Sequence, residues 1–150
     1  MLKLIHPIAG AIGFLTILTF WTSTVGSELF GSLAAVTAVK QAIPWGFLLL
    51  VPALAVTGAS GFRMAGASCD PRIVRKKRRM PFIAGNGILI LIPAALYLAR
   101  LASLGEFGNL FYGIQAVELI AGAANLTLMF LNIRDGLRLT GRWRLRQGNS

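Results

Sequence analysis

Residues 110–133 read LFYGIQAVELIAGAANLTLMFLNI, a run with a single charged side chain, Glu118. A helix needs about 20 apolar residues to cross a hydrocarbon core, and this run is long enough. Three further runs of the same kind occupy about residues 4–25, 42–62 and 82–104. Continuous apolar runs are typical of membrane helices, whereas strands of membrane barrels alternate in polarity. The sequence therefore predicts an all-α membrane protein, a bundle of four transmembrane helices.

The composition supports this class over the soluble ones. The chain has 150 residues, of which 55% are hydrophobic and 13% are charged, whereas a soluble domain carries about 25% charged residues. Disorder requires low hydrophobicity and is excluded. The net charge of +10 would indicate nucleic-acid binding if it covered a soluble face, but the basic residues lie between apolar runs. We expect one transmembrane domain over residues 1–150 and no nucleic-acid partner.

The basic residues predict the orientation, because cytoplasmic segments of membrane proteins are rich in lysine and arginine. Lys3 precedes the first run, seven basic residues lie in the segment 63–81, and five lie in the segment 134–150. The other side carries only Lys40 and Arg100. The first run is longer than the apolar part of a secretory signal, so we expect it to remain as a helix. Both termini and a basic loop at 63–81 are expected in the cytoplasm (N-in/C-in), in a bacterial inner membrane.

A charged layer is expected near the outer side of the bundle. Polar side chains inside membrane helices are costly and usually face the bundle interior. From the helical rise, Glu118 in the fourth run and Arg100 in the third lie close enough in depth to pair. Lys40, at the outer mouth of the second run, is the alternative partner. Such a pair either fixes the register of the helices or forms a proton or ligand site.

A second layer consists of amides. Asn125 and Asn132 follow Glu118 at intervals of seven residues, which places all three on one face of the fourth helix. Asn86 in the third run lies at a depth similar to that of Asn125. Asparagines in membrane helices often hold helices together. The alternative is that these amides bind a ligand.

His6 is the sole histidine and lies beside Pro7 near the start of the first run. Its neutral nitrogen suits ligation of haem iron or proton relay, and the alternative is a ring that is only solvated or hydrogen-bonded. A b-type haem could not have two histidine ligands from one chain, so it would need Met129, Met80, an open position or a second copy of the protein. Clusters of several His and Cys ligands around zinc or copper are excluded, because Cys69 is the sole cysteine.

Basic side chains on the cytoplasmic side are expected to contact anionic lipids, each contributing about 1 kcal/mol near the surface. The last helix is expected to continue beyond the membrane as a basic amphipathic tail over 134–150, lying on the inner leaflet. The expected lipid contacts are Arg75, Lys76, Lys77, Arg78, Arg79, Arg138 and Arg142.

The first run also resembles known families. Its segment 3–8, KLIHPI, continues through an apolar stretch to Phe20 and Trp21. This stretch resembles the small four-helix membrane haem proteins, namely the protoporphyrinogen oxidases and the copper-resistance-type cytochromes. The resemblance covers residues 1–25 and the number of helices, and it implies that His6 holds haem. The chain departs from those families in having no further histidine.

Three functions are compatible with these residues. The first is a small subunit or binding protein of a membrane redox system, which holds haem b at His6 or a quinone with the help of Asn86 and Asn125. The second is a non-catalytic accessory or assembly subunit, whose polar helix faces bind other membrane subunits or further copies of the chain. The third is a small proton-coupled exporter that uses Glu118, although the strong charge bias argues against antiparallel pairing. No hydrolase or phosphate-loop motif occurs in the chain, and no reaction is assigned.

Overall fold

The computed structural model describes residues 2–66 and 71–147, with side chains for 4–64, 66, 71 and 73–138. These residues form helices and short connections, and no strand occurs among them. Four helical segments are long and apolar enough to cross a membrane, which confirms the predicted class. The elements are α1 (Leu2–Phe30), α2 (Leu33–Ala65), α3 (Pro71–Asn86), the π-helix η1 (Gly87–Leu91), α4 (Ile92–Ser103) and α5 (Asn109–Gln147).

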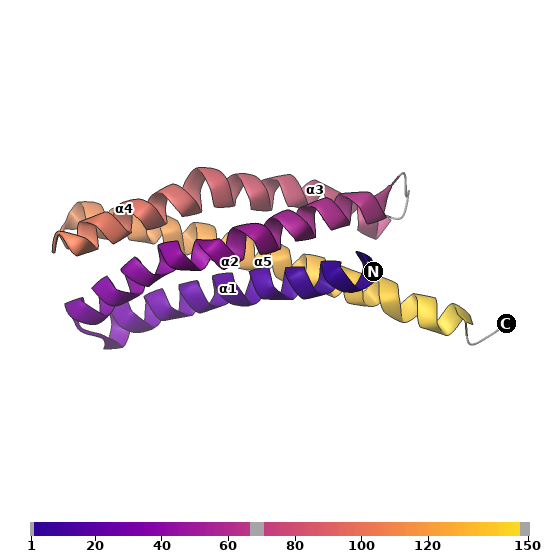
Figure 1. Ribbon diagram of the computed structural model, residues 1–150, viewed down its shortest axis with the longest axis horizontal. Helices are drawn as coiled ribbons and strands as arrows, with labels where there is room; N and C mark the ends of the chain where they lie inside the picture. The colour runs from indigo at the N-terminus through magenta and orange to yellow at the C-terminus, as the bar shows by residue number, and fades with distance from the viewer. Residues whose placement is uncertain (1, 67–70, 148–150) are drawn as a thin grey trace.

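The crossing segments alternate in direction, so the bundle has two distinct ends (Figure 1). The start of α1, the end of α2, the start of α3 and the last turns of α5 lie at one end, which we call the terminal end. The α1–α2 and α4–α5 connections lie at the other, which we call the turn end. Helix α1 packs against α2 and α5, α2 packs against α4, and the α3–α4 segment packs against α5. The four segments therefore form a closed ring around one axis.

Short connections hold the turn end together. Ser32 caps α2 by accepting a hydrogen bond from the backbone N–H of Ala35 (3.3 Å), so only Gly31 and Ser32 separate α1 from α2. Gly105, at φ +72°, takes the left-handed conformation after α4 that glycine favours. Helix α2 begins at Leu33, nine residues before the apolar run expected at about 42–62. Lys40 therefore lies two turns inside the helix.

The third crossing segment contains one widened turn. Pro93 has no N–H to donate, and its ring crowds the carbonyl one turn earlier. The backbone adapts in η1, where the N–H of Ile92 bonds to the carbonyl of Gly87, five residues earlier. Because η1 follows Asn86 directly, this turn sets the position of that side chain relative to α4.

The basic segments are helical wherever the structure describes them. Helix α2 continues to Ala65 and α3 begins at Pro71, so residues 75–79 lie on a helix and not in the predicted loop. Helix α5 continues through the basic tail to Gln147. Charged residues end an apolar run without ending a helix, which is why the crossing helices extend beyond the predicted spans. Cys69 and the side chain of Arg142 lie outside the described residues.

Large apolar side chains cover the outside of the bundle. Trp45, Leu48 and Ile120 are 75%, 73% and 72% exposed, and apolar surface on this scale is typical of a protein that contacts lipid. Two buried clusters lie inside, one around Leu98 and Phe111 near the turn end, and the other including Ile17 and Met129.

Candidate functional site

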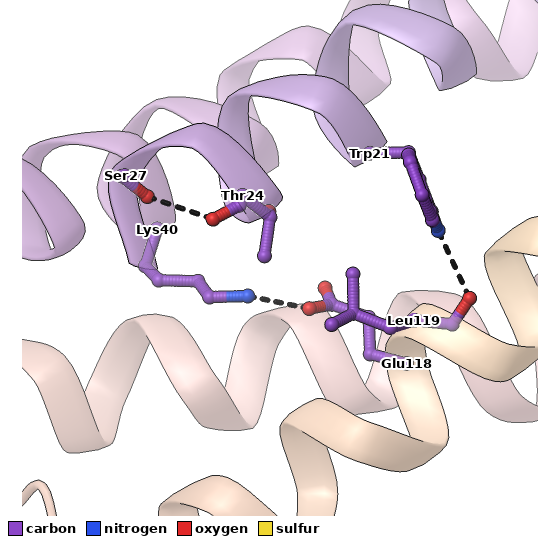
Figure 2. Close-up of polar contacts among 6 residues, drawn as sticks. All are labelled: Trp21, Thr24, Ser27, Lys40, Glu118 and Leu119. Carbon is purple, nitrogen blue, oxygen red and sulfur yellow. Dashed lines mark hydrogen bonds and ion pairs between the residues drawn. The ribbon is translucent and has the colours of Figure 1, made fainter. Parts of the chain in front are cut away.

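A buried ion pair joins α2 to α5 near the turn end. Lys40 Nζ lies 2.5 Å from Glu118 Oε2, and the two side chains are 1% and 12% exposed. Figure 2 shows the Lys40 side chain extending to the carboxylate, beside Thr24 of α1. Arg100, the partner predicted first, is exposed on α4. The correction follows from the early start of α2, which carries Lys40 into the bundle.

The helices around this ion pair approach closely. Trp21 Nε1 of α1 donates a hydrogen bond to the carbonyl of Leu119 on α5 (3.0 Å; Figure 2). A Cβ added to Gly122 would lie 3.0 Å from Trp21 Cδ1, so the ring packs directly on the α5 backbone. Thr24 is buried, and its carbonyl accepts a hydrogen bond from Ser27 Oγ (3.0 Å). The ion pair is therefore enclosed by protein, where its electrostatic interaction is strong.

The middle of the bundle holds the predicted amide layer. Asn86 Nδ2 donates to Asn125 Oδ1 (3.0 Å) and to the carbonyl of Ala121 (2.8 Å). Asn125 is fully buried, and its Nδ2 donates to the carbonyl of Ile83 (3.4 Å). Because the two carboxamides bond to each other and to backbone, this layer favours the interpretation that asparagines hold α3 and α5 together.

A second ion pair ties α3 to α5 at the terminal end. Arg79 Nη1 donates to Asp135 Oδ2 (2.9 Å) and to Asn132 Oδ1 (3.4 Å), and Arg134 Nη2 lies 3.7 Å from Asp135 Oδ1. Asp135 is only 3% exposed. Asp135 is not among the residues predicted from the sequence, because it lies in the basic segment after the fourth run. Its position three residues after Asn132, on the polar face of α5, was the signal that could have found it.

The basic residues expected at the lipid surface fall into two groups. Arg79 and Lys76 turn toward the bundle and bond to other side chains. The others whose side chains are described remain exposed, namely Arg75, Lys77, Arg78 and Arg138.

His6 is fixed by α2 and α3 at the terminal end. Its Nδ1 lies 3.1 Å from the carbonyl of Thr57 and 3.0 Å from Ser60 Oγ, and its Nε2 lies 3.1 Å from Lys76 Nζ. A carbonyl only accepts, so Nδ1 carries the proton, and Nε2 accepts from the lysine ammonium. The Ser60 hydroxyl donates to the carbonyl of Val56 (2.6 Å), which leaves its oxygen to accept from Nδ1. These contacts hold His6 as the neutral Nδ1–H tautomer.

An open groove of about 150 Å³ lies beside this histidine. A Cβ added to Gly61 would lie 3.1 Å from His6 Cε1 and 3.5 Å from Met80 Sδ, so the glycine leaves room where these side chains meet. Two lysines supply positive charge, and most of the remaining lining is apolar. The lining residues are His6, Gly61, Phe62, Met64, Ile73, Lys76, Lys77 and Met80.

The predicted ligand residues do not all meet at this groove. Met129 packs in the core, within 4 Å of the position of a Cβ on Gly13. Asn86 and Asn125 bond to each other, and Asn132 bonds to Arg79. The partners of His6, namely Thr57, Ser60 and Lys76, were missed, because contacts between helices leave no spacing pattern in the sequence.

A haem does not fit this groove. Sites for larger ligands and cofactors enclose about 300–1,000 Å³, and both ring nitrogens of His6 already have partners. No family model, curated protein or solved structure matches this chain. Haem ligation by His6 is implied only by the resemblance of the first helix, and the contacts of His6 among the described residues do not support it.

Proposed function

We propose that this chain is a small subunit or binding protein of a membrane redox system and that it binds a quinone head group in the groove at His6. The observation that carries the proposal is the position of His6 Nε2 and Lys76 Nζ, 3.1 Å apart, at a groove with mainly apolar walls. Quinone carbonyls accept hydrogen bonds, and an ammonium has three N–H donors. Lys76 can therefore donate to a carbonyl while it remains bonded to His6.

The shape and location of the groove support this choice. A single ring with two carbonyl groups suits its volume better than a macrocycle does. Phe62 and Met64 line it and are exposed at its edge, so an isoprenoid tail can leave toward the lipid. The chain's own part is to bind and orient the head group.

We place the terminal end in the cytoplasm of a bacterium. The exposed basic residues of α3 and α5 lie at this end, as cytoplasmic segments require. Arg75, Lys77, Arg78 and Arg138 then face anionic lipids of the inner leaflet. In this orientation the groove would lie near the polar layer of the inner leaflet, where a quinone head group could reach it.

Titration with a short-tail quinone tests the site. We expect decylubiquinone to bind the purified protein in detergent saturably, with one site per chain, in isothermal titration calorimetry. Lys76→Met removes a hydrogen bond from a charged donor, about 1.5–3 kcal/mol, so the Kd should rise about 10- to 100-fold. Arg78→Met is the matched control, since it removes the same charge from an exposed position on the same helix outside the groove. Equal weakening by both variants, or no saturable binding to the native protein, would contradict the proposal.

A second prediction concerns the space at Gly61. In Gly61→Ala the added methyl group meets His6 and Met80, and we expect the Kd for the same quinone to rise about tenfold. Gly58→Ala, on the same helix, has no atom within 4 Å of its new Cβ and should bind like the native protein. Thermal unfolding of both variants verifies that they fold. If Gly61→Ala keeps native affinity, the head group does not occupy this groove.

The second candidate is a non-catalytic accessory subunit. It is favoured by the amide layer and the Arg79–Asp135 pair, whose polar groups are bonded within the bundle. Exposed apolar side chains on every crossing segment, such as Trp45 and Ile120, would then pack against other membrane subunits or further copies. A native protein that shows no saturable quinone binding would favour this candidate.

A further inference from the structure

Two buried acceptors lie near the Lys40–Glu118 ion pair, toward the turn end. Among the described residues, the buried side-chain atoms that accept no hydrogen bond are Glu28 Oε1 and Gln115 Oε1. Gln115 is 4% exposed, so bulk water does not satisfy it. A buried acceptor without a donor is costly and calls for a ligand that donates to it or coordinates it.

The two acceptors lie on the same side of the ion pair. Glu28 follows Thr24 by four residues on α1, and Gln115 precedes Glu118 by three residues on α5. Because α1 and α5 run in opposite directions (Figure 1), both offsets point toward the turn end, by roughly 6 and 4.5 Å. Thr24 lies beside the Lys40–Glu118 pair (Figure 2). Trp21 packs on Gly122, and Glu28 and Gln115 lie seven residues from these two positions, both toward the turn end. A step of seven residues returns to the same face of a helix, so the acceptors lie at similar heights on the faces of α1 and α5 that pack against each other.

The net charge of Lys40, Glu118, Glu28 and Gln115 favours a cation as the ligand. Lys40 and Glu118 compensate each other, and Glu28 adds one negative charge. Arg100 of α4 and Glu106 of the α4–α5 turn are exposed and lie outside the buried group. Carbonyl and carboxylate oxygens suit hard cations and also accept from N–H or O–H donors. Because Glu28 is only partly buried, a cation can reach it from the turn-end surface.

We infer that Glu28 Oε1 and Gln115 Oε1 bind a monovalent cation beside the Lys40–Glu118 pair. The cation is Na⁺, K⁺ or a hydrated proton, each of which brings one positive charge and satisfies both oxygens. The site lies at the opposite end of the bundle from the His6 groove, so it does not depend on quinone binding.

Thermal unfolding of the purified protein in detergent, in salts of equal ionic strength, tests the site. With choline chloride as the reference, we expect NaCl or KCl to raise Tm saturably, by about 5–10 °C at a concentration about 100 times Kd. If the bound species is a proton, Tm rises instead as the pH is lowered in choline chloride, and the metal salts add nothing.

Two variants decide whether the response comes from this site. Glu28→Gln removes the buried negative charge and keeps the shape of the side chain. We expect it to have a higher Tm than the native protein in choline chloride and no response to metal salts or pH. Glu106→Gln removes the same charge from an exposed position near the same end and should respond like the native protein.

The inference is overturned if the native protein responds to neither metal salts nor pH. It is also overturned if the response survives Glu28→Gln or is lost equally in Glu106→Gln. Quinone affinity is expected to be the same in both variants as in the native protein, so failure here leaves the proposed function standing.

Discussion

Replacing Lys40 with methionine is expected to lower the free energy of unfolding by about 3–5 kcal/mol. The Lys40 side chain is 1% exposed and pairs with Glu118, so the variant leaves a buried carboxylate without its counter-charge. Methionine is flexible and fills most of the same volume, so a cavity contributes little to this loss. Unfolding by titration with SDS in mixed micelles, followed by circular dichroism, measures the change.

Two further variants test whether Glu118 pairs with Lys40 or with Arg100. In Lys40→Met/Glu118→Met both charges are replaced by apolar side chains, and we expect most of the lost stability to return, because such replacements are often neutral. Arg100→Met removes the exposed arginine that the sequence favoured as partner and should change stability by less than about 0.5 kcal/mol. If Arg100→Met costs as much as Lys40→Met, the pairing assigned to Glu118 is wrong.

Replacing Gly46 with isoleucine is expected to destabilise the protein by about 3 kcal/mol. A Cβ at Gly46 overlaps the ring of Phe20 on α1. That ring packs edge-on against Phe47, with centroids 6.2 Å apart, so moving it away from Gly46 would disturb this contact. The same SDS titration measures the loss.

Two further variants serve as the control and the rescue for Gly46→Ile. Gly113 on α5 has no atom within 4 Å of an added Cβ, so Gly113→Ile is expected to be nearly neutral. Phe20→Ala in the Gly46→Ile background removes the overlapping ring and should recover part of the stability. A loss of equal size in Gly113→Ile would attribute the effect to the substitution itself and not to the close approach of α1 and α2.

The sequence predicted the four crossings well, because hydrophobic length is a local property. It placed the helix ends less well, because residues such as Lys40 and Arg75 carry charge while their backbone remains helical. The error in the helix ends also affected the predicted partner of Glu118. An apolar run that begins near residue 42 puts Lys40 at its mouth and favours Arg100 as the partner of Glu118, whereas α2 already begins at Leu33.

The amide layer could be predicted because Asn86 and Asn125 lie at matching depths in runs of known direction. The residues that surround His6 could not be predicted from the sequence. Ser60 and Thr57 are small polar residues in an apolar run, and only the packing of α1 against α2 shows that they face the imidazole. Depth along a helix can be counted from the sequence, whereas rotation about its axis depends on the neighbouring helices.

The Lys40–Glu118 pair joins residues 78 positions apart, and this separation has a consequence for biosynthesis. At about 5–20 residues per second, Glu118 is synthesised about 4–16 s after Lys40. During that interval α2 carries a lysine without its partner carboxylate, and the cost of such a lysine in lipid reaches about 2.5–3.5 kcal/mol at a helix centre and is lower near a helix end. We expect the second helix to remain at the insertion machinery or at the membrane surface until the fourth helix arrives. Release of the nascent bundle into the bilayer is therefore expected to depend on synthesis of the fourth helix.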